Sequence, residues 1–100
     1  MEGSSLELVA ARLRRQRARG ARKAAWRCAV TLTVREEREP RWWMLRAALA
    51  LALAQSDEAV ACARQAGFLL RRQGRAGAAM AVSMWLSRRG LRDDDVRRAS

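Results

Sequence analysis

Basic side chains near the N-terminus are the residues whose types and spacing most clearly suggest a chemical role. On a helical wheel, with 100° per residue, six of them gather within about 140° of arc: Arg12, Arg15, Arg19, Arg22, Lys23 and Arg27. An arginine row can lie along a phosphate backbone and release its counterions. A solvated helix face is the alternative, but no acidic residue lies between Leu8 and Val34 to balance the charge. We therefore predict that this basic row binds a polyanion.

Two arginine pairs in the second half of the chain are further candidates. Arg71 and Arg72 come shortly before Gly74, and Arg88 and Arg89 come directly before Gly90. Positive side chains in a last helical turn compensate the helix dipole, which is the simpler interpretation. Each pair could instead clamp a phosphate, the first together with Arg75 and the second together with Arg92. We keep Arg71, Arg72, Arg75, Arg88 and Arg89 as candidate nucleic-acid contacts.

Tryptophans and small residues suggest a surface for contact with another molecule. Trp42 and Trp43 are adjacent, so they point about 100° apart on a helix and cannot both face the same way. Core packing is the first expectation, but a protruding ring would be a stacking platform or a protein hot spot. Ala59, Ala63 and Gly67 place a small residue at every fourth position, which lets another helix approach closely. These five residues form the predicted interaction surface.

The composition argues against several kinds of active site. The 100 residues include no histidine, which excludes histidine-based nucleophilic or acid–base catalysis and mixed Cys/His zinc sites. Cys28 and Cys62 are isolated, which indicates neither a zinc site nor a disulfide framework. Asp93 to Asp95 favour a helix cap over magnesium binding, because no second carboxylate motif accompanies them. We expect no enzymatic activity, no cofactor and no metal.

The elements that must position these residues are predicted to be helical throughout. Apolar residues at steps of three and four predict a first helix over residues 5–29, weakened at Gly20. Val30 to Val34 alternates apolar and polar residues, which favours a short extended connector over an edge strand added to a partner's sheet or a continuation of the helix. Later helices are predicted over residues 40–55, 56–73 and 75–89, with a last turn through Val96 and Ala99. The predicted fold is a small all-α bundle of about four helices, antiparallel in its C-terminal half. It is a single domain, in which residues 1–34 are the basic helix and connector and residues 35–100 are the bundle.

The spacing and the bulk properties of the chain carry two resemblances. The helix–turn–helix spacing near 34 residues, from Trp42 to Ala76, is similar in architecture to a tetratricopeptide repeat, although the characteristic Trp, Leu, Gly and Tyr positions do not fall into register. In size, charge and helicity the chain is similar to the small subunits of RNA-guided CRISPR effector complexes. That resemblance implies a non-catalytic subunit along a nucleic-acid backbone.

The net charge of +11 favours polyanionic partners. We therefore expect a small subunit that binds single-stranded or duplex nucleic acid without sequence specificity, together with other subunits or copies of itself. The alternative is a helical protein–protein adaptor whose arginine face meets an acidic partner.

The cellular location is predicted from the apolar runs and the cysteines. No apolar run is long enough for a bilayer span, and no signal peptide is visible, so we expect a cytoplasmic protein that does not bind membranes. The acid-free, arginine-rich stretch from Leu8 to Val34 has the composition of a mitochondrial transit peptide, but its low serine content counts against that interpretation.

Overall fold

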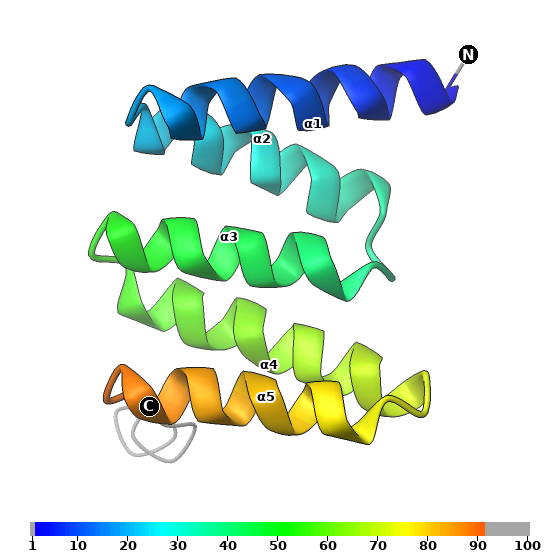
Figure 1. Ribbon diagram of the computed structural model, residues 1–100, viewed down its shortest axis with the longest axis vertical. Coiled ribbons are helices and arrows are strands. Elements are labelled where there is room, and N and C mark those ends of the chain that lie inside the picture. The colour runs from blue at the N-terminus through cyan, green and yellow to red at the C-terminus, as the bar shows by residue number, and fades with distance from the viewer. Residues whose placement is uncertain (1, 92–100) are drawn as a thin grey trace.

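A computed structural model describes residues 2–91, with side chains from Ser5 onward. Five helices make up this part of the chain and no strand occurs in it. They are α1 (Glu2–Ala18), α2 (Arg22–Arg35), α3 (Pro40–Ala52), α4 (Ser56–Arg72) and α5 (Ala76–Arg88). The all-helical prediction is confirmed, but there is one more helix than predicted (Figure 1). The predicted turn after Asp93 lies outside the described residues.

The single helix predicted over residues 5–29 is wrong, because the chain reverses at Gly20. Gly20 has a φ of 76°, a left-handed conformation that glycine adopts without steric cost. The N–H of Ala21 donates to the carbonyl of Gln16 at 2.8 Å, and the N–H of Gly20 donates to Arg17 at 3.0 Å. This is the Schellman arrangement that ends a helix. The glycine is therefore a stop and not a weak point within one helix.

The extended connector predicted at Val30 to Val34 is also wrong, because these residues form the last part of α2. Ala29, Leu32 and Thr33 are all buried at the three- and four-residue spacing of a helix. The alternation of polar and apolar residues was a local coincidence. Packing of this helical stripe against the neighbouring helices outweighs the β preference of valine and threonine.

The boundaries of the last three helices largely follow the prediction. Pro40 occupies the first turn of α3 after an extended Glu39, as the sequence indicates. Asp57 and Glu58 lie in the first turn of α4, where negative charge favours the helix dipole, and no side chain caps this helix. Helix α3 ends three residues earlier than predicted, because Ala54 takes a φ of 59° and starts a turn without a glycine.

The five helices stack side by side in chain order, each antiparallel to the one before (Figure 1). The stack measures 41 × 31 × 22 Å. The α2–α3 pair and the α4–α5 pair repeat with an offset of 34 residues. Helix α2 begins at Arg22 and α4 at Ser56, and each of these two helices contains a buried cysteine, Cys28 and Cys62. Such repetition is typical of helical arrays, in which each unit packs mainly on its neighbours. The antiparallel packing predicted for the C-terminal half is confirmed.

Two apolar clusters hold the array together. The first joins α1, α2 and α3 through Leu13, Leu32 and Leu49. The second joins α3, α4 and α5 through Ala47, Leu70 and Leu86. Many of the other buried residues are alanines, whose small side chains bury little area, so the core is thin.

Candidate nucleic-acid interface

The predicted basic row is divided between two antiparallel helices. Arg12 and Arg15 lie on α1, Arg19 lies in the turn after it, and Arg22, Lys23 and Arg27 lie on α2. All six side chains are exposed, and Arg14 and Arg17, which the wheel analysis left out, are exposed beside them. We call these eight residues of the α1–α2 hairpin the basic end. A single-helix wheel missed the last two because it projected one continuous face, whereas the hairpin brings several faces together.

The charge of the basic end is not balanced by acidic side chains. Arg41 pairs with Glu39 at 3.4 Å and Arg46 pairs with Glu58 at 3.6 Å, and neither of these ion pairs involves the basic end. Glu36, Glu37 and Glu39 gather instead in the turn between α2 and α3. The eight charges therefore face water together and repel one another, a cost that a bound polyanion would relieve.

The two later arginine pairs lie apart from the basic end. Helices α4 and α5 are antiparallel, so Arg71 and Arg72 lie at one end of this hairpin and Arg88 and Arg89 at the other. The α4–α5 turn, which includes Arg75, lies at the edge of the array opposite the α1–α2 turn (Figure 1). Arg88 and Arg89 lie at the end of α5, at the same edge as the α1–α2 turn, but α3 and α4 lie between them and the basic row (Figure 1). Arg92, the predicted companion of the second pair, lies outside the described residues.

Several of these arginines already have contacts within the chain. The Arg72 guanidinium lies 5.7 Å from the centre of the Phe68 ring, and that of Arg89 lies 4.4 Å from the Trp85 ring. Arg75 donates to the Gln73 side chain at 3.5 Å. Such cation–π and polar contacts stabilise the ends of the helices and fit the simpler interpretation of these residues.

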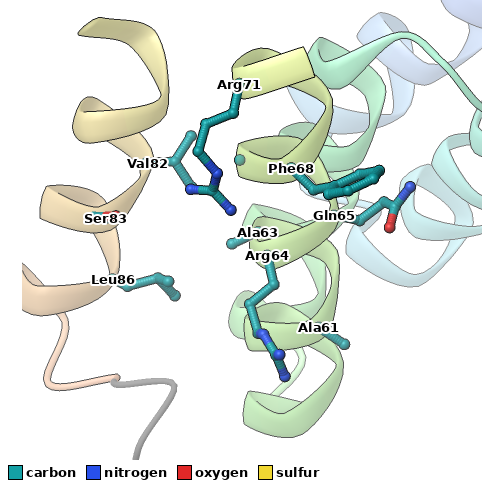
Figure 2. A pocket seen from close by; sticks show the side chains of 10 residues that line it. Ala61, Ala63, Arg64, Gln65, Phe68, Arg71, Val82, Ser83 and Leu86 are labelled. Carbon is teal, nitrogen blue, oxygen red and sulfur yellow. The ribbon is translucent and has the colours of Figure 1, made fainter. Parts of the chain in front are cut away.

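An open groove of about 430 Å³ runs between α4 and α5. Figure 2 shows Arg71 directed from α4 toward Val82 on α5, with Phe68 on the outer side of α4. Gly67 lies at its floor, and a Cβ there would meet the Arg71 head group at 3.6 Å. The groove is therefore shallow and basic on one rim, but it has no polar constellation suited to catalysis.

Small residues predicted as an external interaction surface serve packing within the chain instead. Ala59 and Ala63 are fully buried, and Gly67 is buried beside Val82 of α5. The close helix approach predicted from their spacing is real, but the approaching helices belong to the same chain. Because these residues are buried by packing within the chain, we remove them from the interaction surface.

Trp42 and Trp43 face different apolar clusters, as their 100° separation requires. Trp42 packs on the first cluster and donates its indole N–H to Glu36 at 2.8 Å. Trp43 packs on the second and donates to the carbonyl of Glu37 at 2.8 Å. Arginine head groups lie over both rings, Arg41 over Trp42 at 4.4 Å and Arg46 over Trp43 at 5.5 Å. Neither ring is a free stacking platform.

A polar network connects helices α2, α3 and α4 inside the array. Glu58 of α4 accepts a hydrogen bond from the Trp26 indole N–H and pairs with Arg46. Arg46 also donates to the hydroxyl of Thr33 at 3.0 Å, while its Nε is buried without a partner. The sequence contained a signal for this network: Arg46 is the only charge in its helix after Arg41, and a charge in a buried helix needs a partner.

Cys62 lies beside the same network. Burial raises the pKa of its thiol to about 11, while the positive charge of Arg46 opposes that shift and the negative charge of Glu58 adds to it. At neutral pH the thiol is therefore protonated and a weak nucleophile, which is typical of a structural cysteine.

Comparison with known proteins finds no relative of this chain. No protein-family model, curated protein or solved structure matches the chain. Within the described residues, no helix has the length and apolar character needed to cross a bilayer. The same part of the chain contains no group of three or more His, Cys, Asp or Glu residues that could hold a metal ion.

Proposed function

We propose that this chain binds the phosphate backbone of nucleic acid, without sequence specificity, through the basic end. The observation that carries the proposal is the concentration of eight exposed basic side chains on one hairpin, none of which is paired with an acid among the described residues. Phosphates neutralise such a surface and release counterions as they bind. Seven of the eight are arginines, whose planar fork suits phosphate oxygens.

The same features argue for a binding role without catalysis. The basic end contains no acid and no histidine that could serve as a general base. No groove-reading motif accompanies it, so it would follow the backbone without reading the bases. Membership of a larger ribonucleoprotein or DNA-processing complex, as in the small subunits of CRISPR effectors, is part of the proposal.

Helix α5 supports the assembly part of the proposal. It has no charged residue from Ala76 to Ser87, in a chain of which 31% is charged. Met80 and Met84 are 64% and 48% exposed on its surface. Exposed apolar side chains on an uncharged helix favour contact with another protein subunit.

A salt titration with charge-matched variants tests the proposal. Binding of labelled single-stranded and duplex DNA and RNA is measured by fluorescence anisotropy at several salt concentrations. One variant changes Arg12, Arg15 and Arg19 to Gln. The control changes Arg35, Arg38 and Arg41 to Gln, which removes the same charge from the turn where Glu36, Glu37 and Glu39 balance it.

The basic-end variant should flatten the log–log salt slope by about 3 for duplex and by about 2 for single strands, because each lost phosphate contact removes about 0.9 or 0.7. The control should change the slope by less than half as much. Equal changes would mean that bulk charge, and not the basic end, binds the polymer. Absence of salt-dependent binding by the parent protein would refute the function and favour the adaptor with an acidic protein partner.

A further inference from the structure

A second pocket lies directly beside the basic end. It is lined by Lys23 and Trp26 of α2, by Leu53 and Gln55 of the α3–α4 turn, and by Glu58 of α4, and encloses about 440 Å³. The up-and-down order of the helices produces it, because the α1–α2 and α3–α4 turns lie at the same edge of the array (Figure 1). This pocket is the place where an aromatic ring and the unbalanced basic charge meet.

Trp26 lies on the cationic face of α2. On a helix, Arg22 and Lys23 lie about 40° and 60° to either side of it. Its ring packs partly against the first apolar cluster and also lines the pocket, to which Leu53 adds an aliphatic side chain. Its indole N–H is held by Glu58, so the ring is fixed in place. A fixed aromatic ring within a row of cations is the arrangement that stacks bases of single strands.

The polar residues of the pocket suit a base and not a phosphate. Glu58 contributes carboxylate oxygens, which accept hydrogen bonds but cannot donate them. Phosphate oxygens are acceptors as well, so they cannot form hydrogen bonds with this carboxylate. The amino and imino groups of a nucleobase are donors that match the carboxylate, and the Gln55 side chain can donate or accept.

We infer that the pocket between Trp26 and Leu53 takes one unpaired nucleobase, with Lys23, Arg22 and Arg27 holding the phosphates on either side of it. The inference rests on the proposed function and adds to it a preference for single strands, because a base inside a duplex cannot enter the pocket. Glu58 can accept a hydrogen bond from the exocyclic amino group of cytosine, adenine or guanine, or from the N3–H of thymine or uracil.

An abasic oligomer separates the base from the backbone. Affinity is measured, at one salt concentration, for single-stranded oligo-deoxycytidine and for an oligomer of equal length whose sugars carry no bases. The two ligands have the same phosphates. One stacked base should make the first bind the parent protein at least about fivefold more tightly. In Trp26→Leu this ratio should fall close to one, while the affinity for the abasic oligomer stays unchanged.

Two further variants keep the test decisive. Trp42→Leu is the matched control, because Trp42 packs on the same apolar cluster and lies next to Arg41 outside the pocket, so it should keep the parent ratio. Leu53→Ala removes the aliphatic lining of the pocket at a partly buried position and should lower the ratio even if Trp26→Leu folds poorly.

Each result has one meaning. Salt-dependent binding of both oligomers with equal affinity by the parent protein overturns the inference and leaves the proposed function standing. A base preference that survives in Trp26→Leu and in Leu53→Ala but is lost in Trp42→Leu also overturns it, since the base would then stack elsewhere. Failure of the parent to bind either oligomer removes the proposed function itself.

Discussion

The turn between α3 and α4 should be made more stable by a change to glycine. Ala54 is the one non-glycine residue with a positive φ in the described part of the chain, at 59°. It occupies the same place in its turn as Gly20, Gly74 and Gly90 do in theirs. In each of these turns the N–H of the following residue donates to a carbonyl five residues earlier, as Gln55 does to Ala50 at 2.8 Å. The conformation is thus fixed by the turn, and alanine adopts it at a steric cost.

The size of the effect follows from the backbone alone. A left-handed conformation costs a non-glycine residue about 1–2 kcal/mol. Glycine makes the unfolded chain more flexible, which offsets about 0.4–1 kcal/mol of the gain. Because Ala54 is exposed, losing its methyl group costs little burial. Ala54→Gly should therefore raise the free energy of unfolding by about 0.5–1 kcal/mol, and Tm by a few degrees.

Gly74→Ala provides the reciprocal test by thermal and urea unfolding. Gly74 has a φ of 73°, and a Cβ added there would meet no atom within 4 Å, so the substitution probes backbone conformation only. It should lower the free energy of unfolding by about 1 kcal/mol. A lower Tm for Ala54→Gly, or a Gly74→Ala protein as stable as the parent, would refute the assignment of these turns.

Two other predictions concern buried residues of α4. The pKa of Cys62 is raised from 9.0 to about 11 in the folded state, so its contribution to stability is present below pH 9 and is lost as the pH rises to 11. Urea unfolding across this pH range should show a falling free energy of unfolding, and the fall should be smaller in Cys62→Ala. Gly67→Ala should stabilise the chain by up to about 1 kcal/mol in the same assay, because its Cβ would meet Arg71 and Val82 at ordinary contact distances of 3.6 and 3.9 Å. A loss of stability in Gly67→Ala would show instead that α4 and α5 are packed too closely for a methyl group.

Sequence patterns predicted the helical content, the three C-terminal helices and the stops at Gly74 and Gly90. They succeeded where local signals agreed, as at Pro40, where a proline begins a helix after an extended residue. They failed at Gly20 and at Val30 to Val34. At Val30 to Val34 the outcome depends on tertiary packing. The local sequence does not show that Ala29 and Leu32 will be buried against other helices.

The sequence predicted the part of the candidate site that depends on local properties and missed the part that depends on tertiary packing. Charge and exposure are local properties, so the six residues of the basic row were found from the sequence, and all six are exposed. The pocket beside them is not local, because it requires Trp26 and Glu58, 32 residues apart, to meet. The small residues of α4 show the opposite error, since a pattern suited to close packing does not say which helix will approach.

Folding the basic row into a hairpin changes the ligand that it fits. As one straight helix, residues 12–27 would extend over about 22 Å and follow one phosphate strand. In the hairpin the same charges lie within about two turns of helix from Gly20, a length of about 11 Å. Charges concentrated in this way can face only a short stretch of backbone, about six phosphates of duplex DNA at one per 1.7 Å. A short contact gives limited affinity for nucleic acid by itself. A base pocket beside the basic end and further subunits along the polymer would each increase that affinity.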